Sequence, residues 1–217
     1  MFQSIPVVTR NVLIANIVLF GLQQLAGDWM IVNLALWPLG DPRMATDGAG
    51  GVIEVGFQAW QLLTYGFLHG GLTHLAFNMF ALWMFGGQIE ELMGAKHYLI
   101  YYLVCVVGAA VAQLATVAWF TGGFYPTLGA SGGVFGLLLA FGMFWPHVKI
   151  MPLFPPIPMP AWLFVTLYGA LELFLGVTGS QAGVAHFAHL GGMAFGFVLI
   201  QYWRGRLPIK PRRRLTR

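Results

Sequence analysis

The apolar stretches of this sequence contain a small set of polar side chains that can take part in chemistry. A hydroxyl, several imidazoles, an amide and a carboxyl group occur where the neighbouring residues are almost all hydrophobic. Such groups are costly to bury in a lipid-like environment, so those that occur there usually serve a function. The set comprises Ser131, His189, His186, His74, Asn78, His69 and Glu172.

Ser131 lies in the string Gly129-Ala-Ser131-Gly132-Gly133, a G-x-S-x-G pattern. In soluble hydrolases this pattern presents a nucleophilic serine between a strand and a helix, and no strand is expected here. The same glycines also form G-x-x-x-G pairs, which allow membrane helices to pack closely. Taken alone, the motif therefore favours helix packing over catalysis.

His189 begins the string His189-Leu-Gly-Gly192-Met-Ala-Phe-Gly196. Its glycines allow this segment to approach a neighbouring helix, and we expect that helix to be the one that carries Ser131. A base beside a serine hydroxyl is what nucleophilic catalysis requires. A lone histidine in such a segment is more often structural, and His186, three positions earlier, is the better candidate for a structural role.

His74 and Asn78 are four residues apart, so they project from one face of a helix. Two such donors can stabilise a developing oxyanion, or they can bond to backbone groups of neighbouring helices. His69 is expected to be interfacial or structural. Glu172 could belong to a proton path, but its place near the end of an apolar segment favours a structural role. No carboxylate is placed by the sequence to orient His189, so we predict a catalytic dyad and no triad.

The composition indicates a membrane protein. Only 8% of the residues are charged, 58% are hydrophobic, and the mean hydropathy is +0.74. Soluble domains carry about 25% charged residues, so the solvent around this chain is expected to be lipid. The net charge of +4 comes from a basic stretch at 204–217 that directly follows an apolar segment. This placement indicates a membrane anchor and no nucleic-acid partner, and the single Cys105 excludes a disulfide framework.

Apolar windows long enough to cross a bilayer predict an all-α membrane protein with a six-transmembrane-helix bundle. We expect one domain over residues 1–217, with 204–217 as a basic cytoplasmic tail. The segment between the first two helices is a long external first loop, and a proline-rich link joins the fourth and fifth helices. The predicted helices are 7–25, 72–89, 98–120, 128–145, 161–177 and 185–203.

The distribution of basic residues predicts the orientation of the bundle. Ten of the eleven fall on one side of the predicted helices, and Arg43 alone falls on the other. By the positive-inside rule both termini are cytoplasmic. The second, fourth and sixth helices then all run inward, which places His74, Ser131 and His189 roughly 5–10 Å below the external face. Their shared depth favours a catalytic site over three separate structural roles.

The chain resembles the rhomboid family of intramembrane serine proteases, in a short six-helix bacterial-type form. The resemblance covers essentially the whole chain and rests on three strings in a fixed order on the second, fourth and sixth helices. These are His74-Leu-Ala-Phe-Asn78, Gly129-Ala-Ser131-Gly132 and Ala188-His189-Leu-Gly-Gly192-Met-Ala-Phe-Gly196.

The resemblance implies that Ser131 is the nucleophile and His189 the general base. It also implies an oxyanion hole made by His74, Asn78 and the Ser131 backbone N–H. The residues expected to support these groups are Gly129, Gly132, Phe135 and Gly192.

Two positions depart from the family pattern. The Trp-Arg pair often found in the first loop is replaced by Trp60-Gln61, which affects the anchoring of that loop. Phe135 stands where some members have tyrosine; it can stack on the His189 ring but cannot donate a hydrogen bond.

The resemblance implies an endopeptidase that cuts transmembrane protein substrates within the lipid bilayer, with no cofactor and no metal. Substrates would enter sideways near the second and fifth helices. The compact form favours a bacterial inner membrane. One alternative is a proteolytically inactive client-binding scaffold, which should lack the Ser131–His189 pair. Another is a small proton-coupled transporter, which should carry polar groups across the full membrane thickness, whereas the inner halves of the fourth and sixth helices are apolar apart from Gln201.

Overall fold

The computed structural model describes residues 5–46, 50–152, 156–179, 184–209 and 211. This part of the chain is mainly helical. The helices are α1 (Val7–Ala26), α2 (Asp28–Leu34), α3 (Gln61–Thr64), the short η1 (Tyr65–Phe67), α4 (Leu72–Met93), α5 (Ala95–Thr116), η2 (Val117–Thr121), α6 (Ser131–Phe144), α7 (Ala161–Thr178) and α8 (His186–Trp203).

Six of these helices correspond to the six predicted segments, with bounds that differ by a few residues. The largest difference that matters for function is at α6, which begins at Ser131 and not at residue 128. Gly129 has a φ of 131°, a backbone conformation outside the helical region, and its N–H donates to the carbonyl of Tyr65 at 3.0 Å. The chain therefore enters the helix only after Gly129, and Ser131 is the first helical residue.

Three of the described helices are long and apolar enough to cross a membrane. They are α1, α5 together with η2, and α7; α6 is also apolar but has only 14 residues. The count of six spans, and the external position of the first loop, remain predictions.

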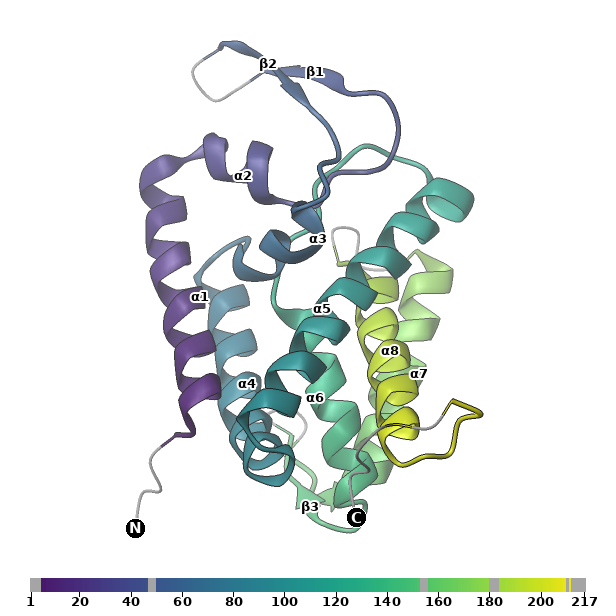
Figure 1. Cartoon of the computed structure of the whole chain (residues 1–217). Helices are drawn as coiled ribbons and strands as arrows, with labels where there is room; N and C mark the ends of the chain where they lie inside the picture. The colour runs from purple at the N-terminus through teal and green to yellow at the C-terminus, as the bar shows by residue number, and fades with distance from the viewer. Residues whose placement is uncertain (1–4, 47–49, 153–155, 180–183, 210, 212–217) are drawn as a thin grey trace.

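The long helices lie roughly side by side, as Figure 1 shows, with α1 at one edge. Helix α5 is central and packs against both α6 and α8. It contributes three completely or almost completely buried tyrosines, Tyr98, Tyr101 and Tyr102. Helix α1 begins and α8 ends at one end of the bundle, while α2 and α3 lie toward the opposite end. The starts of α4, α6 and α8 therefore face the end where the first loop folds.

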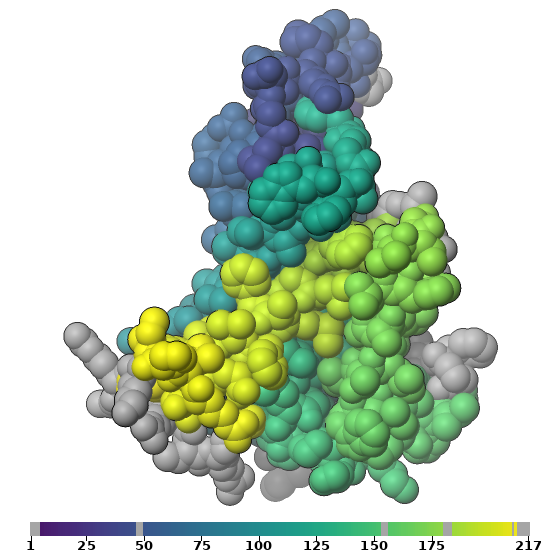
Figure 2. All heavy atoms as spheres, turned by 90° about the vertical axis from the view of Figure 1, so that its right-hand side faces the viewer, coloured from purple at the N-terminus to yellow at the C-terminus, as the bar shows by residue number. Residues whose placement is uncertain are grey.

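The described residues are mostly helical, as predicted, and two short antiparallel ribbons add to the helices. Strands β1 (Arg43–Thr46) and β2 (Val52–Val55) pair with Met44 opposite Glu54, and this hairpin stands out from the helices (Figure 2). Strands β3 (Lys149–Ile150) and β4 (Met159–Pro160) pair at the base of the proline-rich link. Both ribbons are short local pairings that hydropathy windows do not detect.

Gln61 anchors the first loop at the position where the family pattern has arginine. Its side chain is fully buried, and its Oε1 accepts hydrogen bonds from the backbone N–H groups of Trp37 at 3.2 Å and Gln58 at 3.1 Å. Its Nε2 donates to the carbonyl of Gly56 at 3.2 Å. An uncharged amide thus holds two distant parts of the loop together.

Candidate active site

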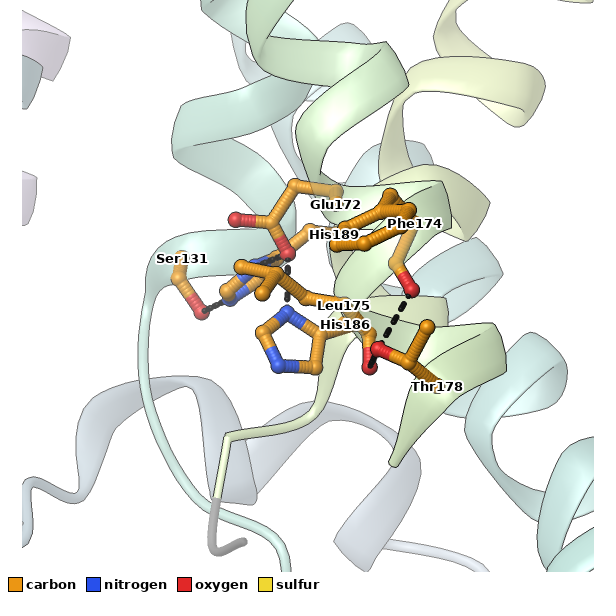
Figure 3. A network of polar contacts seen from close by, with 7 residues as sticks. All are labelled: Ser131, Glu172, Phe174, Leu175, Thr178, His186 and His189. Atoms are coloured by element: carbon orange, nitrogen blue, oxygen red, sulfur yellow. Dashed lines mark hydrogen bonds and ion pairs between the residues drawn. The ribbon is translucent and has the colours of Figure 1, made fainter. Parts of the chain in front are cut away.

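Ser131 and His189 lie within hydrogen-bonding distance, as the sequence predicts. The Ser131 Oγ is 2.8 Å from the His189 Nε2 (Figure 3). The serine is half-buried at the first turn of α6, and His189, the fourth residue of α8, is 9% exposed. A hydroxyl and an imidazole from two helices therefore meet at the helix starts.

Two glycines allow α6 and α8 to come this close. A Cβ added to Gly192 would collide with the backbone carbonyl of Gly132. Gly132 also packs closely against Ala109 of α5, where an added Cβ would collide. Gly196, which we expected at the same contact, instead faces Tyr101 of α5, because it lies one turn further along α8.

Phe135 supports the His189 ring from one side. The two ring centroids are 4.3 Å apart and the ring planes are 6° from parallel, so the rings are stacked. This is the contact expected for phenylalanine at this position. It restricts the orientation of the imidazole without a hydrogen bond.

The absence of a side chain at Gly129 lets the His74 ring lie close to the backbone just before Ser131. The point where a Gly129 Cβ would stand is 2.9 Å from the His74 Nε2 and 3.7 Å from the Ser131 Oγ. Just before Gly129, Thr127 forms a β-bridge with Leu36 of the first loop, with N···O distances of 2.8 and 2.9 Å. The first loop and the glycine thus position the segment that brings Ser131 close to His74.

The hydrogen bonds around His74 indicate which of its ring nitrogens carries the proton. The backbone N–H of Gly70 donates to the His74 Nδ1 at 3.3 Å. In the neutral ring the proton is then on Nε2, the nitrogen that lies nearest to Gly129. Asn78 uses one amide hydrogen to bond the His74 carbonyl at 2.9 Å, and an amide has two. His74 and Asn78 therefore each keep an N–H that these bonds do not use, and both residues line the same cavity as Ser131.

A single cavity of about 1450 Å³ connects these groups. Ser131, His189, His74 and Asn78 all line it. The rest of its wall is largely apolar and comes from several helices, including Phe77, Met84 and Phe85 of α4 and Phe164 and Tyr168 of α7.

Glu172 of α7 contacts the His189 ring, contrary to the prediction that no carboxylate would orient it. The Glu172 Oε2 is 2.9 Å from the His189 Nδ1 and 2.7 Å from the His186 Nδ1 (Figure 3). Glu172 is only 7% exposed, so it does not snorkel to water. The reason is that α7 packs beside α8 (Figure 2) and brings Glu172 to the level of the two imidazoles.

Glu172, His186 and His189 also offer one carboxylate oxygen and two ring nitrogens within 4.8 Å of one another, a donor set that could bind a metal ion. A metal would need the lone pairs of both Nδ1 atoms. The distances of 2.7 and 2.9 Å are typical of hydrogen bonds in which each Nδ1 carries a proton and the carboxylate accepts. The geometry is therefore that of a carboxylate shared by two donors.

His69 has a structural environment, as the sequence indicates. It is 1% exposed, and its ring lies 5.1 Å from the His74 ring in an edge-on arrangement. Gln23 of α1 bonds both backbone groups of His69, at 2.8 and 3.0 Å. Burial lowers the pKa of His69 to about 4, and the nearby His74 adds to this effect. The residue ties α1 to the segment that leads into α4.

The helices and the Ser131–His189 pair define an integral membrane protein with a serine–histidine site. The family model described as the Rhomboid domain matches residues 56–206, which is more than half of the chain. The chain belongs to the rhomboid family.

Similar proteins carry rhomboid names in both mitochondria and bacteria. "Rhomboid protein 1, mitochondrial" of Saccharomyces cerevisiae is 31% identical over 163 residues, covering 68% of this chain and 42% of that protein. Human "Presenilin-associated rhomboid-like protein, mitochondrial" is 31% identical over 156 residues, covering 66% and 39%. "Rhomboid protease GlpG" of Photorhabdus laumondii is 26% identical over 219 residues, covering 93% and 63%.

The chain thus spans about two fifths of the length of the two mitochondrial relatives and 63% of the bacterial one. Because the relatives include mitochondrial proteins, the expectation of a bacterial inner membrane finds no support in them. Membership in the family and the apolar helices place the chain in a membrane.

Proposed function

We propose that this protein is a serine endopeptidase that cleaves transmembrane segments of other membrane proteins. Ser131 is the nucleophile and His189 is the general base. The observation that carries the proposal is the 2.8 Å distance between the Ser131 Oγ and the His189 Nε2 at the wall of a large cavity. An inactive family member would not need this pair.

In the first step, the Ser131 Oγ attacks the scissile carbonyl carbon while His189 Nε2 takes the hydroxyl proton. The tetrahedral intermediate collapses, the C–N bond breaks, and His189 returns the proton to the departing amine. Water then attacks the acyl-enzyme by the same route in reverse, which frees the serine and releases a carboxylic acid. The atoms balance without a cofactor.

The oxyanion donors of the proposal are the Ser131 backbone N–H, His74 and Asn78. Ser131 is the first residue of α6, where backbone N–H groups have no partner within the helix. A Cβ on Gly129 would lie 2.9 Å from the His74 Nε2 and 3.7 Å from the Ser131 Oγ, so both groups approach the same point, which supports His74 as a donor to the carbonyl that Ser131 attacks.

The membrane arrangement of the proposal has six spans, both termini on the cytoplasmic side and the site just below the opposite face. A helical peptide bond is hidden within its own hydrogen bonds, so a substrate must unwind locally before it can react. The cavity is larger than the roughly 300–1,000 Å³ typical of small-molecule sites and can take an extended peptide. Its wall includes α4 and α7, which supports sideways entry between these two helices.

A serine-reactive fluorophosphonate tests the proposal. We expect purified wild-type protein in liposomes to be labelled and to cleave a single-span reporter. Ser131→Ala should remove both labelling and cleavage, and His189→Ala should reduce each to background. Thr166→Ala, which removes an exposed hydroxyl on α7, serves as the control and should change neither. Cleavage by Ser131→Ala at the wild-type rate would exclude this mechanism.

A further inference from the structure

Four polar side chains form a hydrogen-bonded chain at the cavity wall, and of these only Glu172 does not line the cavity. The hydrogen-bonded chain runs from Ser131 to His189, then to Glu172, and from the same carboxylate oxygen to His186. All three residues beyond the serine are buried. The four side chains come from three different helices, α6, α7 and α8.

The bond to Glu172 decides which nitrogen of His189 carries the proton. A carboxylate can only accept, so the Nδ1 of His189 must donate to it. In the neutral ring the lone pair is then on Nε2, 2.8 Å from the Ser131 Oγ. This is the form of the imidazole that can take the hydroxyl proton, and the opposite tautomer cannot.

The carboxylate also places a negative charge beside the imidazolium that forms as the serine attacks. Glu172 is 7% exposed, and its partner atom is 2.9 Å from the ring. In such a poorly solvated place the attraction between opposite charges is stronger than in water. The charge therefore favours the proton transfer itself and not only the orientation of the ring.

We propose that Glu172 is a positioning residue of the catalytic site, so that this chain works with a Ser131–His189–Glu172 triad. The inference rests on the proposed protease function and adds to it. Glu172 does not line the cavity with Ser131 and His189, so it acts through His189 and has no contact with the substrate. His186, as the second donor to the same oxygen, holds the carboxylate in place.

A purely structural role for Glu172 predicts different behaviour. Helix α7 has only two other buried residues, Ala161 and Val165. In that case the two hydrogen bonds between Glu172 and α8 would only hold α7, which has few buried residues, against α8. Removing them would then lower stability and leave the chemistry of folded protein unchanged, so the test must separate rate from stability.

The experiment measures kcat and KM for wild type and for Glu172→Gln, Glu172→Ala and Glu172→Asp against pH, on protein shown to be folded at the assay temperature. The titratable groups around His189 are Glu172 from α7, His186 from its own helix and His74 from α4. Only Glu172 is changed in this series. We expect kcat of Glu172→Gln to fall about 10- to 100-fold with KM within about threefold.

The acidic limb of the kcat profile is the fall of kcat at low pH, where His189 becomes protonated. In Glu172→Gln this limb should move to lower pH by about one unit, because the protonated His189 ring loses its counter-charge. Glu172→Ala should be slower still, since it also loses the hydrogen bond. Glu172→Asp, which keeps the charge on a shorter side chain, should recover part of the rate and the wild-type position of the acidic limb.

Glu90→Gln is the matched control. Glu90 is a buried carboxylate on α4 that accepts from the backbone N–H groups of Val8 and Thr9 and from the Thr9 hydroxyl. The Glu90→Gln variant is expected to be less stable than the wild type but to keep the same dependence of kcat on pH. Dialysis of the wild type against EDTA should leave kcat unchanged, and a loss restored by Zn²⁺ would replace the triad with a metal centre.

The possible outcomes separate this inference from the proposed function. If wild type neither cleaves nor reacts with fluorophosphonate, the protease proposal fails. If wild type is active and Glu172→Gln keeps both its kcat and its acidic limb, the protease stands and the role of Glu172 is overturned.

Discussion

Gly132 of α6 and Gly192 of α8 pack backbone against backbone, and a side chain on Gly192 would occupy the position of the Gly132 carbonyl. Gly132 directly follows Ser131, and Gly192 lies three residues after His189. The contact is therefore one helical turn or less from both polar residues. The separation of the Ser131 hydroxyl and the His189 ring depends on this close approach.

Gly192→Ala tests this dependence. We expect a loss of about 1–3 kcal/mol in stability, because an extra methyl group in a packed core forces the helices apart. Proteolysis should fall more steeply than stability, since the Ser131–His189 distance increases. Thermal unfolding in detergent and reporter cleavage measure the two effects. Gly21→Ala, on an open face of α1, should be neutral or slightly stabilising; equal effects of the two variants would contradict the role of the contact.

Asn78→Ala tests the oxyanion hole. Loss of one such donor lowers kcat by about 10²–10³-fold with little change in substrate binding. Fluorophosphonate labelling should slow in parallel, since the reagent also forms an oxyanion. Gln88→Ala removes an exposed amide from the same helix and should have wild-type kinetics. An Asn78→Ala protein with full kcat would remove this residue from the oxyanion hole.

Gln61→Ala tests the anchoring of the first loop. The variant leaves the backbone N–H groups of Trp37 and Gln58 without their acceptor, which costs about 1–3 kcal/mol when such groups are buried. We expect faster limited proteolysis between α2 and α3. Gln24→Ala, on the exposed surface of α1, is the comparison, and identical digestion of both variants would argue against an anchor at Gln61.

His69 predicts a pH dependence of stability. Its pKa is about 4 in the folded protein, against an ordinary value of 6.5, because burial disfavours the charged ring. Between these two values the unfolded chain binds a proton that the folded chain does not, so stability falls as pH drops from 6.5 toward 4. Thermal unfolding of wild type and His69→Phe measures this effect. Between pH 6.5 and 4 the variant should lose less stability than the wild type. If the stability of both proteins falls equally with pH, titratable groups other than His69 cause the loss of stability.

The place of His74, Ser131 and His189 near helix starts could be predicted from the sequence. Apolar windows locate the helices, and the distribution of basic residues gives the direction in which each helix runs. His74, Ser131 and His189 each lie within four residues of a helix start in the structure. The same argument could have found Glu172, which lies six residues before the end of α7 and so at a similar depth. Its place near a helix end suggested water contact, and only the packing of α7 beside α8 shows that it is buried.

The first loop was the least predictable part. The replacement of arginine by Gln61 left the anchoring of the loop open, but an amide both donates and accepts, and the loop offers it partners of both kinds. The β1–β2 and β3–β4 ribbons depend on pairing between short segments, and no periodic pattern in the sequence marks them.

Only Ala161, Val165 and Glu172 are buried along the 18 residues of α7, so the two hydrogen bonds between Glu172 and α8 tie a helix with little buried surface to its neighbour. In the proposed triad, any outward displacement of α7 would separate Glu172 from both imidazoles and weaken His189 as a base. The rate of the proposed protease would then depend on how readily the lipid lets α7 move, so acyl-chain length and membrane fluidity would be determinants of that rate.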